Sequence, residues 1–410
     1  MATLTLIGEP FADADAAAHA EATHELTRAV AATAPRGCSA RLLIAAEHET
    51  PLFSSARVRV EKLPLRAATL PFLWRTSLTA RPLDGEFVHA LTPLVPLRAR
   101  GDHDGSQTSV TIPHALGWLA PEAMGASLAR QYRSFVKRAV KYADVLVTPT
   151  HATATALQER FGGGLAVQVV PVAAPSGYLR PADADARRAT LGLPERYLAT
   201  TATADATGRL QWLFDALLAD ESLPPLVVLS GSVPCAVAEG ENESAGDGAP
   251  ADTARAGAER SGAAAANGAA SGEPAKPSGP RDADAGPAVP EALRHRVRIV
   301  RPREVADIGT VLSGATLLAL PQALLGAGYE VLGALEANVP VLHADCPVAA
   351  ELSLDAGVPA PDAAAFAHEL SRLIRDDAER ARLGVLAGDR SRSFSWTSTA
   401  MSLWELHANI

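Results

Sequence analysis

Short runs of apolar residues alternate with helix-length segments along most of the chain. Thr316–Leu320 is an apolar run of strand length, and a loop containing Gly326 and Gly328 leads from it into Tyr329–Glu336, which has the composition of a helix. A second apolar run follows at Val339–Leu342. Strand, glycine turn, helix and strand form a βαβ unit, whose loop lies at the carboxyl end of a parallel strand, where such sheets bind ligands. The pattern predicts an α/β protein with a candidate ligand site at this loop.

The same alternation continues through both halves of the chain. In the first half the expected strands are Thr3–Ile7, Arg41–Ala46, Val58–Leu63, Phe87–Ala90, Val110–Leu116, Asp144–Pro149 and Val167–Val172. In the second half, apolar runs predict strands within Leu191–Thr200, at Leu226–Gly231 and at His295–Val300. With its 410 residues, the chain is long enough for two domains of ordinary size. The two series of strands therefore predict two α/β domains.

Helices are expected between these strands. Ala14–Ala32 is rich in strong helix formers, and Thr150 predicts the N-cap of a helix that runs to Phe161. Further helices are expected at Glu304–Ser313, at Asp362–Arg375 and from there to Ala387.

Leu128–Tyr142 predicts an amphipathic helix with a basic polar face. The basic residues are Arg130, Arg133, Lys137, Arg138 and Lys141. Such a face is either solvated or lies against an anionic lipid surface. The sequence leaves both interpretations open.

The elements divide the chain into an N-terminal domain at 1–172, a linker at 173–190, a second domain at 191–387 and a final segment at 388–410. Within the second domain, 235–290 consists mainly of Ala, Gly, Ser, Pro, Glu and Asp. Such a segment buries too little apolar surface to offset the entropy of ordering it. We therefore expect a disordered insertion there.

Charge and cysteine content narrow the class of protein. The formal net charge of −9 argues against a nucleic-acid partner, which needs a basic surface. Cys38, Cys235 and Cys346 are widely separated and odd in number, which favours a reducing cytoplasm and no metal cluster. The first 15 residues have no basic residue before their apolar run, unlike a signal peptide. The uncharged run 308–329 is interrupted by glycine and proline, which favours a buried strand and loop over a membrane span.

The segment around the glycine loop resembles the donor site of family-4 retaining glycosyltransferases, which have the GT-B architecture. Residues in register with the family pattern P-S-x-x-E-G-F-G-L-P-x-L-E-A-M-A-x-G-x-P-V-I are Pro321, Gly326, Gly328, Leu332, Ala334, Pro340 and Val341, followed by Glu351 of the later P-E. The family's two donor-binding glutamates, which have seven residues between them, correspond to Leu325 and Gly333. Glu330 and Glu336 lie nearby at a different spacing.

Two histidine motifs extend the resemblance into the first domain. VTIPHAL resembles the family's V-T-V-H-D-L, with Ala115 in place of the aspartate, and implies that His114 touches the donor sugar. FVHALTP resembles D-V-V-H-x-H-x-P; His89 matches its first histidine and Thr92 replaces the second. A satisfied histidine at a strand end and a ligand contact are both open for His89. The family's glycine pair after the first strand is represented by Gly8 alone.

The cations that hold the donor diphosphate in the family have shifted. Aligning TATADATGRLQWL with V-G-R-x-x-x-x-K-N-L puts Thr203 at the arginine position and Gly208 at the lysine position. Arg209 comes one residue later, and Arg301 replaces a glycine beside the nucleobase. The donor-binding residues that the resemblance predicts are His114, Gly326, Gly328, Tyr329, Glu330, Arg209 and Arg301. The catalytic residues stay unassigned.

The resemblance implies two Rossmann-like domains that face a cleft, with a last helix that crosses back to the first domain. It implies transfer of a hexose from a nucleotide-diphosphate sugar to an envelope glycan, lipid or small-molecule acceptor, with retention of configuration and without a metal or other cofactor. It places the protein in the cytoplasm, with peripheral contact to the inner face of the membrane through the basic helix. The alternative is an inactive homologue that binds a glycan or partners an active glycosyltransferase. The shifted cations and glutamates keep both hypotheses open.

Overall fold

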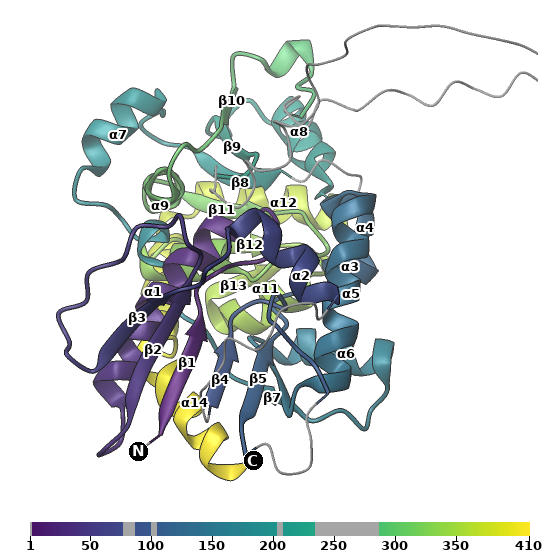
Figure 1. The fold of residues 1–410 in the computed structure, drawn as a ribbon. Coiled ribbons are helices and arrows are strands. Elements are labelled where there is room, and N and C mark those ends of the chain that lie inside the picture. The colour runs from purple at the N-terminus through teal and green to yellow at the C-terminus, as the bar shows by residue number, and fades with distance from the viewer. Residues whose placement is uncertain (1, 77–86, 100–104, 203–207, 234–286) are drawn as a thin grey trace, which may run out of the picture.

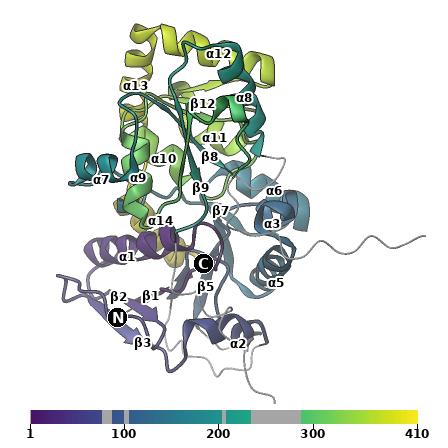
Figure 2. The same cartoon turned by 90° about the horizontal axis from the view of Figure 1, so that it is seen from above.

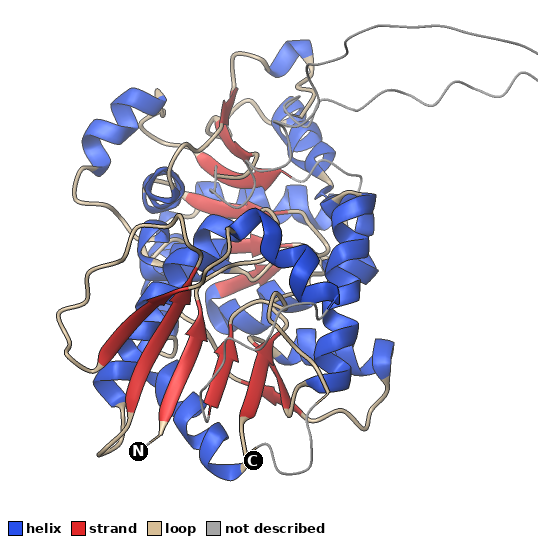
Figure 3. Ribbon diagram, in the orientation of Figure 1, coloured by secondary structure: helices blue, strands red, loops and turns tan. Residues whose placement is uncertain are grey.

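A computed structural model describes residues 2–76, 87–99, 105–202, 208–233 and 287–410 of the chain. The chain forms two α/β domains, each built on a parallel sheet (Figure 1). Helices flank both sheets (Figure 3). The predicted α/β architecture of two Rossmann-like domains is confirmed.

The first domain contains a seven-stranded sheet with the order β3-β2-β1-β4-β5-β6-β7. The strands are β1 Thr3–Ile7, β2 Ser39–Ile44, β3 Val58–Lys62, β4 Phe87–Ala90, β5 Gln107–Thr111, β6 Val145–Thr148 and β7 Val167–Val169. Every neighbouring pair is parallel. The apolar side chains of the inner strands are buried, as expected for a parallel sheet covered on both faces.

Helices connect these strands. They are α1 Ala16–Thr33, α2 Leu70–Thr76 after the short turn η1 Ala67–Thr69, α3 Leu116–Leu119, α4 Pro121–Met124, α5 Ala126–Tyr142 and α6 His151–Phe161. Thr150 caps α6 as predicted, since its hydroxyl accepts the N–H of Thr153 at 3.2 Å. The predicted strand through Leu116 is wrong in its second half: β5 ends at Thr111, and Pro113 has no N–H with which to continue a ladder.

The second domain contains a six-stranded parallel sheet with the order β10-β9-β8-β11-β12-β13. The strands are β8 Leu198–Ala202, β9 Leu226–Ser230, β10 Val297–Val300, β11 Leu317–Leu320, β12 Val341–His343 and β13 Gly357–Pro359. The helices are α7 Ala184–Leu191, α8 Leu210–Ala219, α9 Val305–Ser313, α10 Tyr329–Glu336, α11 Pro347–Ser353, α12 Ala363–Arg375 and α13 Asp377–Ser391, with short turns η2 Ser176–Tyr178, η5 Glu291–Leu293 and η6 Leu354–Ala356. Of the predicted insertion, 235–286 lies outside the described residues.

The last helix, α14 Trp396–Asn409, returns to the first domain and packs along α1 (Figures 1 and 2). The indole Nε1 of Trp404 donates to the Val30 carbonyl at 3.1 Å, and the Thr399 hydroxyl donates to the Pro171 carbonyl at 2.7 Å. The chain end therefore holds the two domains together.

A buried chain of hydrogen bonds also joins α14 to the first sheet. Ser109 on β5 contacts His89 Nδ1 at 2.8 Å and His407 Nε2 at 2.9 Å through its hydroxyl. His89 Nε2 lies 3.4 Å from the Thr111 hydroxyl. Both ring nitrogens of His89 thus have partners inside the sheet, which favours the structural interpretation of this residue.

These two histidines predict a loss of stability in weak acid. Burial lowers the pKa of His89 to about 3 and that of His407 to about 4. An unfolded histidine has a pKa of about 6.5, so between that pH and the folded pKa the unfolded chain binds protons that the folded chain does not. Stability contributed by the neutral rings is present above about pH 6.5 and falls as the pH falls. We expect His407 alone to cost on the order of 3 kcal/mol between pH 7.5 and 4.

The measurement is the midpoint of chemical unfolding at several values of pH. His407→Gln should flatten the dependence between pH 6.5 and 4, because glutamine has no proton to bind. A wild-type midpoint that does not change over this range would contradict the prediction.

Candidate functional site

The predicted glycine loop lies at the boundary between the two domains. The loop after β1 reaches the loop after β11, and the Asp15 Oδ2 atom accepts the backbone N–H of Ala327 at 3.3 Å. α1 and α14 lie at the same boundary (Figure 2). The candidate site is therefore built by both domains.

His114 forms a buried pair with Asp13. Its Nε2 atom lies 3.1 Å from Asp13 Oδ2, and the two side chains are 2 % and 5 % exposed. The other carboxylate oxygen of Asp13 accepts the N–H of Asp15 at 3.1 Å. Burial alone would raise the pKa of Asp13, but the hydrogen bond from His114 and the nearby imidazoles hold it below its ordinary value. Asp13 is an ionised acceptor at neutral pH.

This pair fixes the tautomer of His114. Because a carboxylate only accepts, Nε2 must carry a proton, and in the neutral ring Nδ1 is then an acceptor. Nδ1 is buried and has no hydrogen-bond partner among the described residues. The ring stacks on Tyr132 at 4.7 Å between centroids, and the Tyr132 hydroxyl donates to the His114 carbonyl at 2.9 Å. The imidazole is thus held rigidly, with one buried ring nitrogen whose hydrogen-bonding capacity is unused within the described chain.

The carboxylate that pairs with His114 does not come from the residue that follows it in the chain. The family's histidine is followed by aspartate, and here that position is Ala115. The carboxylate comes instead from the loop after β1, 101 residues earlier in the sequence. Asp13 was not among the predicted site residues.

Tyr329 begins α10 and contacts α1 of the other domain. Its hydroxyl lies 3.1 Å from His19 Nδ1, and both residues are buried. Burial lowers the pKa of His19 and raises that of Tyr329 well above its ordinary value, so both are neutral. The ring of Tyr329 also packs against Tyr178 at 5.7 Å. In this arrangement the hydroxyl of Tyr329 bonds to the first domain.

Two further carboxyl groups lie beside Asp13. Burial and the charge of Asp13 raise the pKa of Asp15. Burial and the charge of Asp15 raise the pKa of Glu330 to about 7. Asp13 therefore opposes the ionisation of Asp15, and Asp15 opposes that of Glu330. The predicted anion-binding loop is surrounded by acidic side chains.

The glycines of this loop are required by close packing. Gly328 has φ of 78°, and a Cβ there would lie 2.5 Å from Leu352 Cδ1 of α11. A Cβ at Gly326 would lie 2.3 Å from Asp15 Oδ2. Backbone does approach closely at Gly326, as expected of such a loop, and the group it approaches is Asp15.

The two residues that align with the family's glutamates are both packed closely against their neighbours. Leu325 is buried in the hydrophobic core. Gly333 on α10 faces η2, so that a Cβ there would lie 2.8 Å from the Tyr178 carbonyl oxygen and 3.0 Å from Leu312 Cδ1. A glutamate has no room at residue 333 in this arrangement.

Arg209 lies at the start of α8, in the loop after β8. Its φ of 47° is unusual for a residue with a Cβ, and its guanidinium carbon lies 4.9 Å from the ring centre of Trp212. β8 neighbours β11, and Gln322 after β11 donates to the Thr201 hydroxyl on β8 at 3.0 Å. Arg209 therefore lies at the carboxyl ends of the strands, as the glycine loop does. Thr203, at the family's arginine position, lies outside the described residues.

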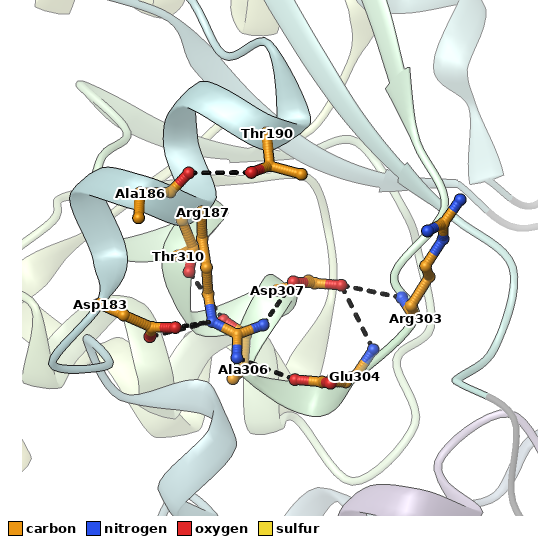
Figure 4. A network of polar contacts seen from close by, with 9 residues as sticks. All are labelled: Asp183, Ala186, Arg187, Thr190, Arg303, Glu304, Ala306, Asp307 and Thr310. Carbon is orange, nitrogen blue, oxygen red and sulfur yellow. Dashed lines mark hydrogen bonds and ion pairs between the residues drawn. The ribbon is translucent and has the colours of Figure 1, made fainter.

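Arg301 lines a separate cavity of about 410 Å³ at the carboxyl end of β10. Arg303 shares this cavity. The wall beside them is a network in which Arg187 contacts Asp307 at 2.9 Å and Glu304 at 2.8 Å (Figure 4). Two arginines at the end of an edge strand can meet an anionic ligand.

A second cavity, of about 550 Å³, lies between α2 and α5. Its lining, as far as the described residues go, includes Arg75, Arg130, Arg133, Lys137, Arg138 and Lys141 and no acidic side chain. The Arg133 guanidinium donates to the Gly117 carbonyl at 2.7 Å, and the Lys141 Nζ atom lies 5.0 Å from the centre of the Tyr142 ring. The predicted basic face of α5 thus forms a hollowed, strongly positive surface. Within the described part of the chain, no helix is both long and apolar enough to cross a membrane.

The structure brings together five of the seven predicted donor-site residues. His114, Gly326, Gly328, Tyr329 and Glu330 meet at the domain boundary. Arg209 and Arg301 lie in the loops after β8 and β10 of the second sheet. A role in donor binding stays a prediction for all seven.

Sequence reasoning missed Asp13, Asp15 and His19. The signal was present in the stretch ADADAAAH, where two aspartates and a histidine lie close together after the first strand. Their partners lie in distant parts of the sequence, so only the fold shows what they contact.

Comparison of the whole fold with solved structures defines the class of protein: the chain has the GT-B fold. It aligns over its full length with sucrose-phosphate synthase from Thermosynechococcus elongatus, at a TM-score of 0.64 and 17 % identity over 99 % of that chain. WaaG, a glycosyltransferase involved in lipopolysaccharide biosynthesis, aligns with 98 % of this chain and 99 % of its own, at a TM-score of 0.58 and 15 % identity. Anabaena Alr3699/HepE, solved in complex with UDP-glucose, aligns over all of both chains at 0.59 and 13 %.

Sequence comparison points to particular relatives. The D-inositol 3-phosphate glycosyltransferase of Corynebacterium efficiens is 31 % identical over 141 residues, which is 33 % of this chain and 33 % of the relative. The enzyme of that name from Corynebacterium glutamicum is 31 % identical over 144 residues, 32 % of this chain and 33 % of its own. The chain thus spans about a third of the length of these curated relatives. No family model matches the sequence.

Proposed function

We propose that this protein is a glycosyltransferase that moves a hexose from a nucleotide-diphosphate sugar to an acceptor with retention of configuration. The observation that carries the proposal is the Asp13–His114 pair at the boundary of the two Rossmann-like domains, a rigid imidazole whose buried Nδ1 atom has no hydrogen-bond partner among the described residues. A neutral Nδ1 would accept a hydrogen bond from a sugar hydroxyl. Partial homology to two glycosyltransferases and a fold shared with a protein solved with UDP-glucose support the same function.

Arginines near the donor would supply positive charge for the leaving diphosphate. Arg209 is held at the start of α8 by its contact with Trp212, on the same edge of the sheet as the glycine loop. Arg301 lies at the end of β10. Charge-assisted contacts of this kind replace a metal ion in stabilising a departing phosphate. In this proposal no metal is required.

The basic cavity of α5 is our candidate contact for the acceptor side. The six cationic side chains that line this cavity favour an anionic surface or an anionic acceptor. We propose that this surface brings the protein to the anionic inner face of a membrane when the acceptor is a lipid.

One observation favours the second function, an inactive homologue that binds a glycan or partners an active glycosyltransferase. The two positions where the family places donor-binding glutamates are occupied by Leu325 in the core and by Gly333 against η2. A site without these carboxylates would bind sugar without turning it over.

Nucleotide binding and sugar transfer distinguish the two functions. Thermal melts of the full chain with saturating UDP, GDP and ADP should show a rise in melting temperature with one of them, because a ligand that binds only the folded state stabilises it. Release of that nucleotide from its glucose conjugate then measures turnover. No shift with any nucleotide, at concentrations that shift an active relative, would contradict the glycosyltransferase. Binding without release, across several acceptors, would favour the inactive homologue.

A further inference from the structure

Asp15 occupies the N-cap position of α1 without capping that helix. An aspartate at this position ordinarily accepts a backbone N–H from the first turn of its own helix. Here the side chain makes no such bond, and its Oδ2 atom instead accepts the N–H of Ala327 in the other domain. The contact draws the carboxylate away from its usual local partner.

The N–H that Asp15 accepts belongs to the glycine loop before α10. In a βαβ unit the amides of such a loop point at an anionic ligand. Asp15 Oδ2 also fills the space beside Gly326, since a Cβ there would lie 2.3 Å from it. A carboxylate of the chain itself therefore stands where the loop would meet a ligand's phosphate.

Electrostatics do not favour this contact by themselves. Asp15 lies among acidic neighbours, because Asp13 raises its pKa and Asp15 in turn raises that of Glu330. Other bonds between α1 and the second half of the chain hold the carboxylate in place. The His19–Tyr329 pair spans 3.1 Å, and Glu21 accepts the N–H of Gly177 at 2.9 Å.

We propose that Asp15 gates the donor site: its carboxylate occupies the Ala327 amide in the nucleotide-free protein, and the diphosphate of a nucleotide sugar must displace it. Two anions cannot share one N–H donor, and like charges in a partly buried site repel. This inference rests on the proposed function, and adds to it a residue that sets how tightly the donor binds. Opening of the two domains releases Asp15, and the donor then takes its place.

Asp15→Asn tests the gate, because it keeps the size of the side chain and removes its charge. Since Asp15 caps nothing in α1, the substitution should leave folding intact. We expect isothermal titration of the full chain with UDP to give a dissociation constant roughly tenfold lower than that of the wild type. Asp15→Ala, which also removes the acceptor atom, should bind at least as tightly as the asparagine variant.

The matched control is Asp389→Asn, which removes one negative charge from the exposed surface of α13, where Asp389 contacts only its neighbour Arg392 in the bonds of the described chain. Its affinity for UDP should equal that of the wild type. If Asp15→Asn and Asp389→Asn bind UDP with the same affinity, the gate is overturned. The proposed function still stands in that case, provided that the wild type binds nucleotide.

Hydrogen exchange supplies a readout without nucleotide. The Ala327 amide should exchange faster in Asp15→Ala than in the wild type, because it loses its acceptor. Equal exchange would overturn the contact on which the gate depends. Nucleotide binding by Asp15→Asn alone would support the gate most strongly. Absence of binding in all variants would refute the proposed function, and the gate with it.

Discussion

His114→Ala is expected to lower kcat/KM for sugar transfer by roughly 30- to 160-fold. The substitution removes a buried acceptor fixed at the domain boundary and leaves the Asp13 carboxylate without the imidazole that keeps it ionised. Losing a hydrogen bond to a charged partner in a buried site costs about 2–3 kcal/mol, and each 1.36 kcal/mol is a factor of ten in rate. The measurement is the initial rate of nucleotide release from the donor sugar that the protein binds.

His368→Ala on the exposed face of α12 is the control for this experiment and should leave the rate unchanged. Asp13→Asn keeps the His114 ring and changes its tautomer. The asparagine NH₂ group can donate to Nε2, which moves the ring proton to Nδ1 and turns the open acceptor into a donor. We expect a loss in rate that approaches that of His114→Ala. An unchanged rate in both variants would remove His114 from the proposed site.

Gly333→Glu, which restores a family glutamate, is expected to destabilise the fold. The new side chain would start 2.8 Å from the Tyr178 carbonyl oxygen and 3.0 Å from Leu312, on a buried face of α10. Overpacking and burial of an unpaired carboxylate together outweigh the gain in helix propensity over glycine. We expect a loss of about 3 kcal/mol in the free energy of unfolding. That loss corresponds to a melting temperature roughly 6–12 °C lower.

Gly163→Glu is the matched control, because a Cβ at Gly163 meets nothing within 4 Å and the residue is exposed. Its melting temperature should stay close to that of the wild type. If Gly333→Glu melts like this control, η2 can move away from α10. The glutamate position would then be open in solution, which would favour an active donor site.

Acidic residues near the glycine loop come from the segment that follows the first strand. The loop after the first strand carries Asp13 and Asp15. One aspartate fixes His114, and the other contacts the loop that precedes α10. Under the proposed function, donor binding would first separate the Asp15 carboxylate from the Ala327 amide.

The amino-acid sequence alone determined the type and place of most strands and of the longer helices, but not of α7, which lies largely in the predicted linker. β1, β4 and α10 occupy the predicted residues, because apolar runs of strand length and a glycine loop before a helix are local signals. The boundaries that differ, such as the end of β5 at Thr111, lie where a proline interrupts the strand pattern. The two-domain α/β fold followed from the repetition of these signals.

Only the tertiary structure decided what the site contains. The partner of His114 is 101 residues away, and the partner of Ala327 is 312 residues away. The space at Gly333 is closed by Tyr178 from a different segment. Helix and strand signals act over a few residues, whereas these contacts arise because loops at the ends of two separate sheets meet when α1 and α14 bring the domains together. The sequence therefore gives the identity of each side chain. Its partner and its charge state depend on how the loops of the two domains pack together.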